Sequence, residues 1–141
     1  MNPGQRALLS AALRHARDAE ALLPTSPDQA WHLAGFAPEC ARKACLTERW
    51  ADRILGHAMD RQAEDLVRLA VALDARARRQ GLDARLAAAP ALQRWSPNDR
   101  YRTTGTTTAA DARDLCDEAR QILLEVTSGL WADGVLDTPE I

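Results

Sequence analysis

The chain has 141 residues, enough for one domain around a single hydrophobic core. Its 18 basic and 20 acidic residues give a formal net charge of -2, so the overall charge does not attract nucleic acid and any basic site must be local. No apolar run is long enough to cross a membrane, and the first residues lack the apolar core of a signal peptide. These features predict a cytoplasmic protein that does not contact a membrane.

The residue types favour helices over strands. Alanine, leucine and arginine are abundant, whereas aromatic residues make up only 4% of the chain and β-branched residues are few. The cysteines, Cys40, Cys45 and Cys116, show no CxxC spacing, and we expect them to be small buried side chains in a reducing compartment. No pair of cysteines or histidines has ligand spacing on one helix face, so the sequence predicts neither a metal nor another cofactor.

The first two expected helices are separated by Pro24. Hydrophobic periodicity predicts a helix over roughly Gln5–Leu23. His15 falls within its apolar stripe, and we expect this imidazole at the edge of the core with one hydrogen bond. Ser26-Pro27-Asp28-Gln29 then has the pattern of a capping box, with Pro27 suited to the first helical position.

The stretch Ala30–Leu46, AWHLAGFAPECARKACL, is the centre of the predicted fold. Pro38 removes a backbone donor inside this second helix, which predicts a kink near Gly35. Glu39 precedes Lys43 by one helical turn on the polar side, the favourable order for an ion pair. The opposite side is built mostly from small residues, which let neighbouring helices approach closely: Ala30, Leu33, Ala34, Ala37, Cys40, Ala41, Ala44 and Cys45.

A third long helix is expected over Asp60–Gln80, with Gly81 as its C-terminal stop. A short helix over Asp83–Ala89 should follow and be stopped by Pro90. The apolar stripe of the third helix consists of Ala63, Leu66, Val67, Leu69, Ala70, Leu73 and Ala77.

The last part of the chain should contain a loop and one more helix. Leu92–Thr108 is irregular, because proline, asparagine, glycine and a threonine run disfavour helix there. The last helix is expected over Thr108–Ser128, with Gly129 as its terminator and Leu130–Ile141 as a partly docked tail. Four long helices joined by short connections predict an all-α fold. It would be an up-and-down four-helix bundle with a short extra helix and an ordered loop before the last helix, in one domain.

The irregular stretch is also the best candidate for a binding site, because it gathers aromatic and guanidinium groups on a loop. One interpretation pairs Glu39 with Arg100, whose planar guanidinium suits a carboxylate, and so ties the loop to the second helix. The alternative is a solvated Glu39 that pairs only with Lys43. No catalytic residue is predicted, and the predicted ligand-binding residues are Glu39, Lys43, Trp95, Arg100, Tyr101 and Arg102.

Three segments carry a family resemblance. His32–Leu46 has an aromatic residue, glycine and a second aromatic residue, followed by Glu-Cys and a basic residue. Gly56-His57 is followed by Asp65-Leu66 and Leu69, and Trp95–Tyr101 reads WSPNDRY before the final helix. Together these segments resemble the HEPN family (higher eukaryotes and prokaryotes nucleotide-binding), a family of small helical bundles.

The resemblance implies a bundle that dimerises and, in many members, a metal-independent ribonuclease. Those members carry an arginine four to six residues before a histidine near the final helix, where the arginine stabilises charge and the histidine moves a proton. This chain has no histidine after His57, and the arginines nearest before it, Arg49 and Arg53, lie in a different segment. Ribonuclease activity of the family type is therefore not expected.

These features leave three interpretations of function. The first is a non-catalytic HEPN-like module in a toxin–antitoxin or defence context. It would bind a partner protein such as a nucleotidyltransferase, a nucleotide-like ligand or RNA. The second is a divergent HEPN ribonuclease toxin, which requires His57, Arg100 and Arg102 to converge. The third is a purely structural homodimer. A homodimer is also predicted from apolar residues that fall outside their helices' stripes, namely Leu13, Trp31 and Leu124.

Overall fold

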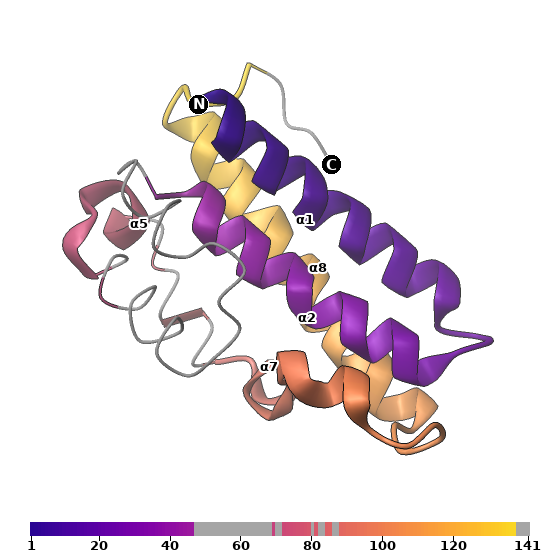
Figure 1. Ribbon diagram of the computed structural model, residues 1–141. Coiled ribbons are helices and arrows are strands. Elements are labelled where there is room, and N and C mark those ends of the chain that lie inside the picture. The colour runs from indigo at the N-terminus through magenta and orange to yellow at the C-terminus, as the bar shows by residue number, and fades with distance from the viewer. Residues whose placement is uncertain (47–68, 70–71, 80, 82–83, 86–87, 138–141) are drawn as a thin grey trace.

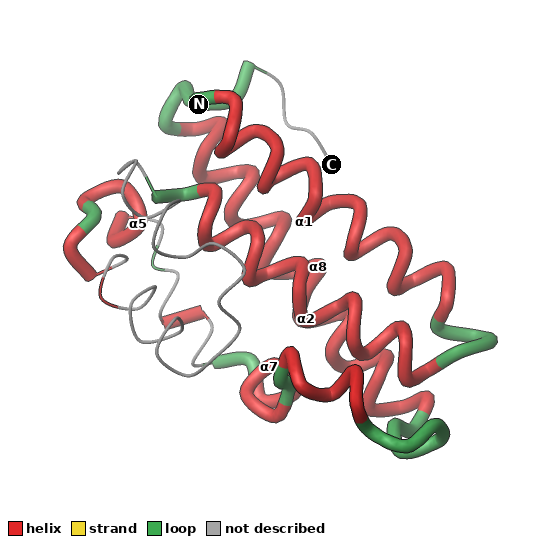
Figure 2. The backbone as a smooth tube through the Cα atoms, viewed as in Figure 1, coloured by secondary structure: helices red, strands yellow, loops and turns green. Residues whose placement is uncertain are grey.

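The computed structural model describes residues 1–46, 69, 72–79, 81, 84–85 and 88–137. Its elements are α1 (Pro3–Leu22), α2 (Pro27–Ala44), α5 (Ala75–Arg79), α7 (Pro90–Arg94), the 3-10 helix η1 (Pro97–Tyr101) and α8 (Ala109–Ala132). No residue of this part of the chain lies in a strand, as Figure 2 shows, which confirms the all-α fold class. Among the same residues, no helix is both long enough and apolar enough to cross a bilayer.

The long helices α1, α2 and α8 form the body of the molecule (Figure 1), and α2 packs against both of the others. α1 and α2 are antiparallel, whereas α8 runs in the same direction as α2. The start of α1 therefore lies beside the end of α8. At the opposite end of the bundle, α7 packs on α8 and η1 packs on α2.

The core is built largely from alanine, as the small-residue stripe of α2 predicts. Alanine has the highest helix propensity and loses no rotamer entropy on burial, so an alanine-lined contact favours both the helices and their close packing. Leu33 and Cys40 of the predicted stripe are only half-buried. The fully enclosed members are Ala30, Ala34, Ala37, Ala41 and Ala44 in α2 and Cys45 directly after it. They pack in one cluster with Leu9, Ala12 and Ala19 of α1 and with Leu115, Ala119, Ile122, Leu123 and Val126 of α8.

The first two helices begin differently from the expectation. α1 starts at Pro3 because Asn2 caps it: the Asn2 side chain accepts from the Gln5 amide at 2.9 Å, and the Gln5 side chain accepts from the Asn2 amide at 3.0 Å. The predicted capping box at Ser26 is wrong, since its side chain makes no cap hydrogen bond, although Pro27 does occupy the first turn. α2 continues through Pro38 as one helix.

The predicted third helix lies mostly outside the described residues, but its C-terminal part is interrupted at Asp74. Asp74 is not helical, and its Oδ1 accepts from the amides of Arg76 at 2.9 Å and Ala77 at 3.1 Å, so it caps a new short helix, α5. Ala77 is buried as predicted, whereas Leu69 and Leu73 are 53% and 66% exposed and do not belong to the core.

The regions around the last helix also need correction. Pro90 begins α7 instead of ending a helix. Of the short helix expected over Asp83–Ala89, Ala84 and Arg85 are helical, whereas Ala88 and Ala89 are not. α8 runs past Gly129 to Ala132 and is followed by Gly134, whose φ of 67° is the left-handed conformation that favours glycine. The expected tail therefore begins as helix.

Candidate functional site

Asp99 attaches η1 to α2. Its carboxylate, only 5% exposed, accepts from the Trp31 indole at 2.7 Å and from the Ser96 amide at 3.1 Å. Its second oxygen pairs with Nε of Arg102 at 2.9 Å. A buried carboxylate is costly unless charged or polar donors satisfy it, and here three donors do so. Asp99 thus fixes both the turn that contains it and the position of that turn on α2.

Trp95 makes the second attachment and explains why residue 35 is a glycine. A Cβ at Gly35 would lie 2.2 Å from carbon atoms of the Trp95 ring system, so only glycine lets the indole rest on the α2 backbone. The indole nitrogen donates to the carbonyl of His32 at 3.3 Å, and the ring meets Phe36 edge-to-face with centroids 5.0 Å apart. This close contact is a role of Gly35 that helix periodicity does not reveal.

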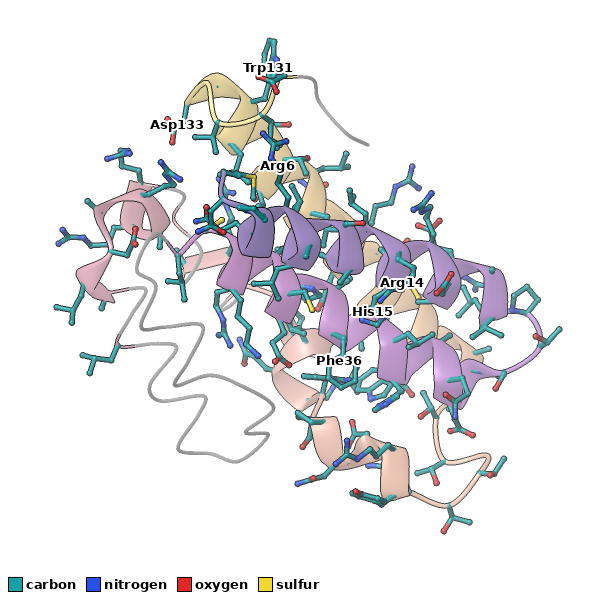
Figure 3. All side chains as sticks on the ribbon, turned by 45° about the horizontal axis from the view of Figure 1, so that its top comes forward. Arg6, Arg14, His15, Phe36, Trp131 and Asp133 are labelled. Atoms are coloured by element: carbon teal, nitrogen blue, oxygen red, sulfur yellow. The ribbon has the colours of Figure 1, made fainter. Side chains whose placement is uncertain are left out.

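Two histidines complete the aromatic cluster around Phe36. The rings of His15 and His32 lie 5.8 Å and 5.0 Å from the Phe36 ring, centroid to centroid. Figure 3 shows His15 and Phe36 close to each other. The Nδ1 atom of each histidine is enclosed without a hydrogen-bond partner, so it does not make the single bond expected for His15. Burial lowers the pKa of both imidazoles, assisted by Arg14 beside His15 and by Arg100 beside His32.

The threonine-rich loop before α8 is held by the first turn of α2. Asp28 accepts from the Gly105 amide at 2.5 Å and from the Thr107 amide at 2.8 Å. These backbone hydrogen bonds, Gly105 first, lower the pKa of Asp28. The loop is therefore ordered, as predicted. The carboxylate that holds it is Asp28, which the sequence pattern places in a capping box.

The predicted pair of Glu39 and Arg100 does not form. Glu39 pairs with Lys43 at 2.5 Å, with side chains 16% and 15% exposed. Arg100 lies instead over the ring of Tyr101, at 4.7 Å from its centroid. The reason is the orientation of η1: Trp95 and Asp99 make its contacts with α2, which leaves Arg100 and Tyr101 exposed to solvent.

The six predicted ligand-binding residues therefore fall into three groups. Glu39 and Lys43 form a shielded ion pair on α2, and Trp95 and Arg102 hold η1 in place. Only Arg100 and Tyr101 remain free to meet a ligand: Tyr101 is 75% exposed, and Arg100 makes no ion pair with any described residue. His57, required by the ribonuclease interpretation, lies outside the described residues.

Sequence reasoning missed Arg94, and it misread Trp31. The guanidinium carbon of Arg94 lies 5.7 Å from the Trp31 ring centroid, and its Nη1 pairs with Asp111 at 3.1 Å. Trp31 is only 4% exposed, so it cannot contribute to a dimer surface as predicted. Trp31 lies outside the apolar stripe of α2, and it is buried because α7 and η1 cover it. Helix periodicity does not reveal this contact, since the two segments are distant in sequence.

The cysteines behave as small apolar residues. Burial raises the pKa of Cys45 to about 12 and that of Cys116 to about 11, so these thiols stay protonated at neutral pH. Cys40 is half-buried, and all three cysteines are free. Within the described ranges, no group of three histidine, cysteine or acidic side chains is arranged to hold a metal ion.

Comparisons with known proteins add no relative to this geometry. No protein-family model matches the chain, and neither a curated protein nor a solved structure matches it significantly.

Proposed function

We propose that this chain is a non-catalytic HEPN-like module that binds a nucleotide-like ligand on the outer side of η1. The pair formed by Arg100 and Tyr101 is the observation that carries the proposal. The guanidinium carbon of Arg100 lies 4.7 Å from the Tyr101 ring centroid, and Tyr101 is 75% exposed. An exposed aromatic ring stacks on a nucleobase, and a guanidinium without a carboxylate partner binds phosphate through two parallel hydrogen bonds.

The attachment of η1 supports this use of its outer side. Asp99 and Trp95 hold the short helix on α2 from the inner side through the indole and backbone donors described above. The two outer residues are therefore presented from a fixed backbone, which reduces the entropy lost when a ligand binds. Because the net charge of the chain is -2, attraction of a phosphate depends on such a local group.

Two further observations support the HEPN-like part of the proposal. The segments His32–Leu46 and Trp95–Tyr101, which both resemble the family, contact each other through Gly35 and Trp95. In addition, α8 runs parallel to α2, the direction that an up-and-down bundle requires of its second and fourth helices. We extend the proposal to that four-helix architecture, to a homodimer, and to a protein partner such as a nucleotidyltransferase in a toxin–antitoxin or defence context.

Titration calorimetry of the purified chain with ATP and with AMP tests the binding site. We expect both nucleotides to bind. Tyr101→Ala and Arg100→Ala should each weaken binding about 5- to 160-fold, because loss of one aromatic stack or one phosphate contact costs about 1–3 kcal/mol. Arg17→Ala is the matched control, since Arg17 is an exposed arginine on α1 and its removal should leave the affinity unchanged.

Comparison of Arg100→Ala with Arg17→Ala also separates a specific site from non-specific attraction between charges. If Arg17→Ala weakens binding as much as Arg100→Ala does, the nucleotide is held by general charge and the site is wrong. If the unmodified chain binds neither nucleotide at millimolar concentration, the nucleotide part of the proposal fails.

A further inference from the structure

His15 and His32 are the imidazoles that the proposed binding surface does not use. They come from α1 and α2, and both rings contact Phe36, with centroids 5.8 Å and 5.0 Å away. Trp95 contacts Phe36 as well, at 5.0 Å. One continuous aromatic cluster therefore joins α1 and α2 to residues 90–101, which contain α7 and η1 and are called the α7–η1 segment below.

The cluster suits neutral imidazoles better than charged ones. Nδ1 of each ring is enclosed and unpaired, so protonation of both ring nitrogens would create a buried N–H without an acceptor. Phe36 packs against both rings, and its side chain offers neither of them a hydrogen-bond acceptor.

The acidic groups closest to the cluster are already paired, so they offer little to a new positive charge on His15 or His32. Glu39 is already paired with Lys43, and Asp99 already accepts from Trp31, Ser96 and Arg102. The charged groups that face the two histidines are Arg14 and Asp18 from α1, Glu39 from α2, and Asp99 and Arg100 from η1.

We propose that His15 and His32 make the attachment of the α7–η1 segment to α2 dependent on pH: neutral imidazoles keep Trp95 seated on Gly35 and Phe36, and protonated imidazoles release it. The enclosed Nδ1–H of an imidazolium needs an acceptor such as water, and the Trp95 contact is the part of the cluster that can open without separating the long helices. The carbonyl of His32 is also the acceptor of the Trp95 indole, so displacement of His32 removes that hydrogen bond.

The direction of the effect follows from proton binding. Both histidines have a lowered pKa in the attached state, so this state binds fewer protons than the released state. Attachment should therefore be at full strength above about pH 6.5, the usual pKa of histidine, and should weaken as the pH falls below that value. The inference does not depend on the ligand proposed above.

Nuclear magnetic resonance of the 15N-labelled full chain between pH 8 and pH 5 tests it without any ligand. The chain has four tryptophans, and Trp95→Phe identifies the indole signal of Trp95. We expect this signal to move to the position of a solvated indole, with a midpoint below about pH 6.5, while the backbone signals of α1, α2 and α8 stay dispersed. Ending the titration at pH 5 keeps most carboxylates ionised, so the change reports on histidines.

Variants assign the transition to these two residues. The double variant His15→Gln, His32→Gln should keep the attached Trp95 signal down to pH 5, whereas His57→Gln, which changes the remaining histidine, should behave like the unmodified chain. A Trp95 signal that stays in place in the unmodified chain, or a transition that persists in the double variant, overturns the proposal. Should the double variant not fold, the imidazole C2–H signals of the unmodified chain decide. His15 and His32 must then titrate together with Trp95 and below about pH 6.5, and a separate or higher midpoint overturns the proposal as well.

Discussion

A missing Cβ and a buried carboxylate decide how the α7–η1 segment lies on α2. Gly35 leaves room for the Trp95 indole, and Asp99 collects donors from Trp31 and from its own turn. Helix periodicity shows on which side of α2 a residue lies, but it does not show which distant segment covers that side. The sequence therefore predicts most of the α2 stripe, but it does not predict the contact of Trp95 with Gly35, and it assigns the buried Trp31 to a dimer surface.

Of the two expected partners of Glu39, only Lys43 is present, because only this pair depends on local spacing. Glu39 and Lys43 lie one helical turn apart, and both side chains are largely shielded from solvent. The pair with Arg100 required knowing which side of η1 faces α2. That side is set by Trp95 and Asp99, whose contacts span distant parts of the chain.

Gly35→Ala should destabilise the protein by about 1–3 kcal/mol, the usual cost of overpacking, because the new Cβ would lie 2.2 Å from ring atoms of Trp95. In the Trp95→Ala background the clash is gone. The same substitution should then stabilise by up to about 1 kcal/mol, since alanine is a better helix former than glycine. Urea denaturation of the four proteins of this cycle measures both changes. The same sign in both backgrounds would show that Trp95 does not rest on Gly35.

At the scale of elements, the helices that the sequence predicts well are the ones that carry their own signals. α1, α2 and α8 have an apolar stripe and a proline or capping residue in the expected region, and their bounds differ from prediction by a few residues. α7 has Pro90 at its first position but no capping side chain before it, and its first turn is capped from another helix. Oε1 of Glu118 in α8 accepts from the Ala91 amide at 3.0 Å, and Oε2 accepts from the Leu92 amide at 2.9 Å.

Replacing Glu118 tests whether this cap maintains α7. Glu118→Gln keeps the size of the side chain but removes the negative charge at the N-terminal end of α7 and turns one acceptor into a donor. We expect hydrogen exchange at the Ala91 and Leu92 amides to accelerate about fivefold, which corresponds to a loss of about 1 kcal/mol. Asp117→Asn, an exposed neighbour, is the control and should leave both amides unchanged. Equal protection in Glu118→Gln would mean that α7 is held by its apolar contacts alone.

At the scale of the whole molecule, the two ends of the bundle expose different side chains. The end formed by α7 and η1 presents Arg100 and Tyr101, whereas Trp131, 52% exposed, lies near the end of α8 at the other end (Figure 3). Leu13 and Leu124, predicted to lie outside the core, are half-buried and so leave part of their surface uncovered. Trp31 no longer supports a dimer, whereas the exposed indole of Trp131 is one of the large apolar side chains that can.

If two copies associate through the Trp131 end, light scattering at micromolar concentration should give twice the 15.5 kDa mass of one chain. Trp131→Glu should return the mass to that of the monomer, because a carboxylate at an apolar interface is left without water or a partner. Tyr101→Glu alters an aromatic residue of greater exposure at the opposite end and should leave the dimer intact. A monomeric mass for the unmodified chain would exclude the homodimer, and dissociation by Tyr101→Glu alone would place the interface on η1. In that second case the proposed nucleotide site and the dimer contact would compete for the same residues, and ATP would shift the mass toward the monomer.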